Sequence, residues 1–210
     1  MKISKLFDFQ YNLKEEPFKR LVEKALVEAY EKFFSVFGFK VNDILTVKIF
    51  SSREDYKDWT GYGDRYRNWM VGRCDASKNE IGVIIPTVAE RPENEMIMIV
   101  KHEAYHYLLE KCFGDIKNIV LNEGMACFLA DQIVDNSIDL KDIVSIKKLN
   151  GPDFADLDGY TLAPIYISYI IRNFGYKKFV EIVNDENFYL QFPKDFERIA
   201  IDQHNNTLIK

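Results

Sequence analysis

The stretch VKHEAYHYLL, residues 100–109, holds two of the three histidines in a chain of 210 residues. His102 and His106 are four residues apart, and Glu103 directly follows the first of them. The surrounding pattern predicts a helix over residues 92–112, with a proline at its start and Gly114 beyond its last apolar residues. Because four residues make about one helical turn, we expect both imidazoles on one face of this helix.

The predicted helix is apolar on nearly all of its sides, which indicates that it is buried. Two histidines and a glutamate buried together are unfavourable unless they have partners. A zinc ion provides one, because a tetrahedral site accepts two imidazole nitrogens from a single helix face. Glu103 lies about 100° around the helix, where it cannot easily be a ligand but can reach a water on the same ion. The alternative is a chance H-E-x-x-H pattern on a surface helix.

The stretch IVLNEGMACFLADQI, residues 119–133, places Glu123 near the start of a second predicted helix and 17 residues beyond His106. A helix, a short connection and a second helix would bring Glu123 back beside the histidine pair. Two histidines, one carboxylate and a position open for water are typical of catalytic zinc. Gly124 would allow a close approach of the two helices.

Glu123 also has a simpler interpretation, as a first-turn glutamate that the helix dipole favours. If it is not the third ligand, Asp131 and Glu110 are the next candidates.

HEAYH followed by LNEGMA resembles the gluzincin metallopeptidases, in particular the compact peptidase-MA-like domains. The resemblance covers about residues 44–184, more weakly outside the two motifs. It implies a zincin-like fold, with His102, His106 and Glu123 as ligands of Zn²⁺ and Glu103 as general base. It also places a later helix near the site, which makes two of its tyrosines candidates for stabilising the oxyanion. These catalytic candidates are Tyr160 and Tyr166.

One position departs from the resemblance. Some gluzincins carry an aspartate four residues after the ligand glutamate, where it hydrogen-bonds to a zinc histidine, whereas this chain has Cys127. The hydrogen-bond partner of that histidine is therefore unassigned. This affects the tuning of the zinc site more than metal binding itself.

The order of predicted elements indicates an α+β fold in a single compact domain, residues 1–210. Residues 1–90 form a sheet part, with a small and mostly antiparallel sheet, and residues 91–210 form a helical part. The predicted elements are a helix over 17–38, a strand over 44–50, a short helix from Ser52 to Trp59, a hairpin joining 69–74 to 80–86, and helices over 92–112, 119–135, 160–173, 176–184 and 194–202.

The segment EIGVIIP, residues 80–86, has two interpretations. Its imperfect alternation and closing proline fit a strand at a sheet edge, to which an extended substrate would add as one more strand. Alternatively, it is a central strand with Val83 and Ile85 in the core.

Composition narrows the function classes. A net charge of -5 gives no electrostatic reason to expect nucleic acid or a membrane as partner. Three cysteines without close spacing, and no leader-like apolar run, favour a soluble cytoplasmic protein. His204 has polar neighbours, which predicts exposure to solvent.

The leading interpretation is a zinc peptidase acting on a peptide or protein substrate. The alternatives are a catalytically silent zinc-binding regulatory or interaction domain of peptidase ancestry, and a metal-free interaction domain. An intact Glu103 argues against the silent domain, because a structural zinc site has no use for a base.

Overall fold

The computed structural model describes residues 2–208, apart from the side chain of residue 13. The chain divides into two compact units, Met1–Cys112 and Phe113–Lys210, and each is described by itself. The histidine helix belongs to the first unit, together with the sheet, whereas the sequence pattern grouped it with the helices that follow it.

The first unit contains a four-stranded sheet with the order β1-β2-β4-β3. Its strands are β1 (Phe7–Gln10), β2 (Leu45–Phe50), β3 (Gly72–Asp75) and β4 (Glu80–Ile84). The expectation of a mostly antiparallel sheet was wrong, because β1, β2 and β4 run parallel and only β3 pairs antiparallel with β4. The reason lies in the connections, since α1 (Glu16–Phe37) and α2 (Arg53–Thr60) carry the chain back across the sheet between parallel strands.

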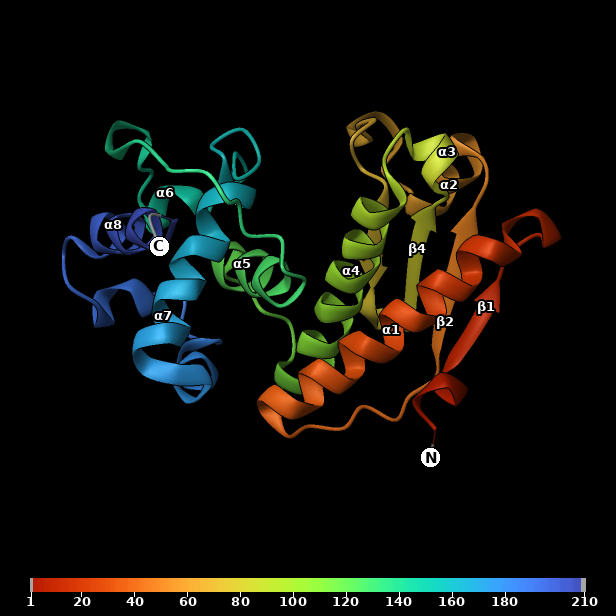
Figure 1. Ribbon diagram of the computed structural model, residues 1–210, viewed down its shortest axis with the longest axis horizontal. Helices are drawn as coiled ribbons and strands as arrows, with labels where there is room; N and C mark the ends of the chain where they lie inside the picture. The colour runs from red at the N-terminus through yellow and green to blue at the C-terminus, as the bar shows by residue number, and fades with distance from the viewer. Residues whose placement is uncertain (1, 209–210) are drawn as a thin grey trace. The chain divides into compact units, whose positions relative to one another are not determined.

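Helices cover the two faces of this sheet differently (Figure 1). On one face lie α1 and α4 (Glu93–Phe113), and the strand residues beneath them are apolar and buried: Leu45, Val47, Ile49, Ile81 and Val83. On the other face α2 packs through Trp59, whose ring fills the space over Gly82. The Trp59 indole N–H donates to Glu80 at 3.1 Å, so this second face is partly polar.

Local sequence signals account for several ends of these elements. Gly38 ends α1 in the left-handed conformation, with a φ of 75°. The hydroxyl of Ser52 caps α2 by accepting a hydrogen bond from the Asp55 amide at 3.3 Å. The predicted hairpin is confirmed as β3 and β4, joined by a turn in which Asn79 is left-handed. The short helix α3 (Pro86–Ala89) then leads into α4.

The second unit is helical, with α5 (Ile119–Leu129), α6 (Ile146–Leu149), α7 (Gly159–Ile182) and α8 (Phe196–Leu208). Two separate helices were predicted where α7 lies, and Gly175 marks the break between them with a φ of 75° and a ψ of 172°. The prediction for α5 ran six residues too far. Asp131 takes a left-handed conformation and the Gln132 amide bonds back to the Cys127 carbonyl, which ends the helix.

Between residues 2 and 208, none of the helices is both long and apolar enough to cross a membrane.

Candidate metal centre

His102 and His106 lie in the middle of α4, as predicted, and their imidazoles meet on one side of the helix. The two Nε2 atoms are 2.8 Å apart, and the ring centroids are 4.5 Å apart with the planes at 81°. His102 is buried, with only 8% of its surface exposed. Both rings therefore direct a nitrogen at the same small region.

The residues present fit a metal ion at this point. Two imidazole nitrogens that face each other at 2.8 Å need a proton or a cation between them, because each neutral ring would otherwise direct a lone pair along that line. Imidazole nitrogen is a preferred ligand of zinc, and also of copper, iron and nickel.

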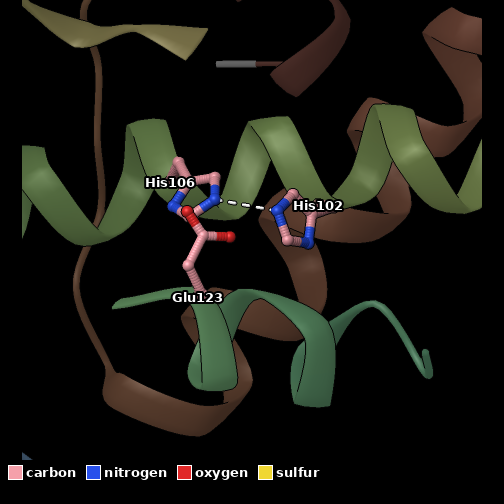
Figure 2. A group of neighbouring side chains, drawn as sticks. All are labelled: His102, His106 and Glu123. Atoms are coloured by element: carbon pink, nitrogen blue, oxygen red, sulfur yellow. Dashed lines mark hydrogen bonds between the residues drawn. The ribbon is translucent and has the colours of Figure 1, made fainter. Parts of the chain in front are cut away.

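Glu123 lies on α5, which begins at the N-cap Asn118. The Asn118 side chain accepts a hydrogen bond from the Leu121 amide at 3.1 Å, and the first turn of α5 contains no acidic residue. Glu123 comes after that turn, so the simpler interpretation as a first-turn glutamate does not hold. Ligand atoms of His102, His106 and Glu123 all lie within 4.8 Å of one another (Figure 2).

The other candidates for the third ligand are placed differently. Of the described residues, the group with Glu123 is the one set of three or more His, Cys, Asp or Glu residues that could hold a metal ion. Glu110 is exposed on α4, and Asp131 lies past the end of α5 in the left-handed conformation. The donor set of this group suits several divalent metals and is not specific to zinc.

Gly124 allows a close approach of two helices, but its close neighbour is α7. A Cβ built at Gly124 would lie 2.8 Å from Cγ1 of Ile167 and 2.9 Å from the backbone oxygen of Ala163. Any side chain there would push α5 away from α7, because backbone cannot yield as a flexible side chain can. The glycine next to Glu123 thus fixes α5 within the second unit.

Glu103 is buried on α4, with 9% of its surface exposed, and it faces β3. A Cβ built at Gly72 would lie only 2.9 Å from its Oε1 atom, so the carboxylate rests against bare backbone. Burial first, and then the negative charge of Glu103, raise the pKa of the Cys74 thiol well above its usual value. The same two causes raise the pKa of Tyr56. Cys74 is therefore a neutral thiol, which makes it a poor nucleophile and metal ligand.

Sequence reasoning missed Gly72, Cys74 and Tyr56 as neighbours of Glu103. One signal was present, since a glycine inside a strand pattern often marks a close approach of another group. Cys74 and Tyr56 carried no such signal, because their proximity depends on strand pairing.

The strand with two interpretations is central. Glu80–Ile84 pairs with β2 on one side and β3 on the other, so an extended peptide cannot add to it. The expectation of an edge strand there was wrong, because the hairpin folds β3 onto its outer side. Val83 is buried as the alternative expected, although Ile85 is only partly so. The strand next to Glu103 is β3, and it is an edge of the sheet.

The two tyrosines proposed for the oxyanion have different surroundings. Tyr166 is fully buried, and its hydroxyl donates to the Val144 carbonyl at 2.9 Å. Burial raises its pKa, so the phenol stays protonated. Tyr160 is 41% exposed at the start of α7, and its ring packs edge-on against Phe154.

Cys127 is buried in α5. One further sequence expectation concerns the second unit. His204 was expected to be exposed, and this was wrong. It is buried to 8% exposure on α8, with Nε2 3.1 Å from the Asn136 carbonyl. The polar residues beside His204 in the sequence lie on other sides of the helix, which the pattern of neighbours alone did not reveal.

Searches against protein-family models, curated proteins and solved structures found no match to this chain.

Proposed function

We propose that this protein is a zinc-dependent peptidase of the gluzincin, peptidase-MA-like type. The observation that carries the proposal is the arrangement on α4, where two imidazole nitrogens converge at 2.8 Å and the residue after His102 is a buried glutamate. His102 and His106 would hold the ion. Glu123 would be the third ligand, which leaves one position of a tetrahedral site for water.

The proposed roles follow from the chemistry of each group. Zinc, when bound, supplies a Lewis acid that lowers the pKa of water and polarises a carbonyl. Glu103 accepts a proton from the attacking water at its carboxylate and then donates it to the departing amine. The buried position of Glu103 supports this role, because proton transfer in an apolar setting avoids competition from bulk water.

The edge strand β3 is the proposed contact for the substrate backbone. It lies beside Glu103 and, within the part of the chain that the structure describes, pairs on one side only, with β4. An extended peptide would add to the other side through backbone hydrogen bonds.

The test is turnover of a mixed peptide library by the purified protein, by chelator-treated protein and by protein reloaded with zinc. Hydrolysis should vanish with chelator and return with zinc. Glu103→Gln should abolish it while the zinc remains bound. Glu110→Gln is the matched control, since it changes an exposed glutamate on the same helix. Bound zinc without any hydrolysis by the wild type would contradict the proposal and favour a silent zinc-binding domain.

A further inference from the structure

Gly72 and Glu103 come from different elements of the first unit and lie in direct contact. Gly72 begins β3, and its pairing with Val83 turns it toward the face that α4 covers. A Cβ built at Gly72 would lie 2.9 Å from Oε1 of Glu103, 3.1 Å from its Cγ, and 2.6 Å from Cγ2 of Ile99. The carboxylate thus occupies the space that any side chain at residue 72 would need.

The ladder with β4 restrains β3 at this position. Gly72 lies opposite Val83 in the antiparallel ladder, and the Val71 carbonyl accepts a hydrogen bond from the Ile84 amide at 3.0 Å. The helix cannot move easily either, because Glu103 has buried α4 residues on both sides of it along the helix. The side chain of Glu103 is the part that can yield, by rotation to another rotamer.

We propose that Gly72 is a positioning residue for Glu103. The bare backbone of β3 leaves space for the carboxylate, and this contact holds the carboxylate in one place against the strand. The inference deepens the proposed function, because it rests on Glu103 acting as the general base. A glycine in a strand weakens that strand, so a glycine here is explained by the group packed over it.

A displaced base should impair turnover without removing the metal. A misplacement of about 1 Å in a reacting group can reduce the rate about 100-fold. Gly72→Ala should therefore lower kcat by roughly ten- to 100-fold. The zinc content should stay at the wild-type level, because the atoms that a new Cβ at residue 72 would meet first belong to Ile99 and Glu103 and not to either histidine.

Two companion variants separate positioning from packing. A Cβ at residue 72 would meet Cγ2 of Ile99 as well as Glu103, and Ile99→Ala removes that Cγ2 atom. The double variant Gly72→Ala/Ile99→Ala therefore relieves the clash with Ile99 and leaves the clash with Glu103. Gly82→Ala is the matched control on the opposite face, where the new Cβ would lie 2.3 Å from the Trp59 ring. It should lower stability but leave kcat per folded, zinc-loaded molecule unchanged.

The measurements are zinc content, kcat on the peptide library, and crystal structures of wild type and Gly72→Ala. The inference is supported if Gly72→Ala and the double variant both lose kcat with zinc retained, and if the Glu103 carboxylate has left residue 72. It is overturned if Gly72→Ala has the kcat of the wild type, or if adding Ile99→Ala to Gly72→Ala restores kcat. A wild type that does not hydrolyse peptides would contradict the proposed function but not this inference. The position of Glu103 in the Gly72→Ala crystal would still show whether Gly72 positions the carboxylate.

Discussion

Each face of the sheet in the first unit carries a glutamate, and the two have different neighbours. Glu80 lies on the α2 face, where Lys48 donates to it at 2.8 Å and the Trp59 indole at 3.1 Å. Glu103 lies over the α4 face, against Gly72 and next to the metal-ligand candidate His102. There burial first, and then the charge of Glu103, raise the pKa values of Cys74 and Tyr56.

Under the proposed function, the difference separates a structural carboxylate, Glu80, from a catalytic one, Glu103. Glu80 has a cation and an N–H donor supplied by neighbouring elements, which is how folded proteins stabilise a half-buried charge. Glu103 is held deeper, in surroundings that disfavour other charges, and sites of this kind are where proteins sacrifice stability for function.

The largest expected effect comes from neutralising each glutamate in turn. Glu103→Gln should lower turnover by about 10²–10⁴-fold, because it removes the general base, and should leave the free energy of unfolding equal or higher. Glu80→Gln should do the reverse, with a loss of about 1–2 kcal/mol and unchanged turnover per folded molecule. Urea unfolding and peptide turnover measure the two effects. If both variants lose stability alike and keep their activity, the contrast does not exist.

Gly124→Ala tests a glycine of the second unit that allows close packing of α5 against α7. The new Cβ would meet the Ala163 carbonyl oxygen at 2.9 Å, and overpacking of this kind costs about 1–3 kcal/mol. The shift of α5 should also weaken zinc binding about tenfold, since Glu123 moves with it. Gly151→Ala is the control, because its Cβ would come no closer than 3.4 Å to the Lys148 carbonyl. Equal stability of the two variants would show that α5 has room to spare.

The contribution of Glu80 to the free energy of unfolding should depend on pH. Burial alone would raise the pKa of Glu80, but the hydrogen bonds from Lys48 and Trp59 outweigh it and the pKa is lowered. A lowered pKa in the folded state stabilises the fold above the unfolded pKa of about 4.3 and loses that contribution as pH falls through the folded value.

The difference in unfolding free energy between wild type and Glu80→Gln should therefore be constant from neutral pH down to about pH 5 and shrink below pH 4.3. Urea titrations across this range measure it. A difference that grows in acid would have the wrong sign for this ion pair.

The smallest effect is expected for Tyr166→Phe. Its hydroxyl donates to the Val144 carbonyl, so its loss should cost about 1 kcal/mol and leave turnover unchanged. Thermal unfolding and kcat measure the two outcomes. A fall in kcat of about 100-fold at constant zinc content would instead make Tyr166 the group that stabilises the oxyanion.

Local features of the fold were predictable from the sequence, and long-range ones were not. The histidine helix was found nearly to its ends, because its apolar run, its starting proline and Gly114 are all local signals. The strand β1 has only four residues and was missed. Its parallel pairing with β2 depends on the crossover through α1, a helix of 22 residues. The local strand pattern does not predict which strands pair across such a connection.

The candidate site also combines local features that the sequence predicts with long-range contacts that it does not. The shared face of His102 and His106 follows from a spacing of four residues within one helix. The contact of Glu103 with Gly72 joins a helix to a strand 31 positions earlier, so it depends on the order of strands in the sheet. The close neighbour of Gly124 was likewise a matter of helix packing, and α7 is separated from it by more than thirty residues.

The metal site is tested most directly by the metal content of protein purified without chelator, for wild type, His106→Ala and His204→Ala. The third histidine is the matched control, because it is as buried as His102 but bonds to the Asn136 carbonyl. Wild type and His204→Ala should each carry about one zinc per chain, and His106→Ala should lose most of it. A wild type that is metal-free and fully stable, or a His106→Ala variant that retains its zinc, would contradict the account.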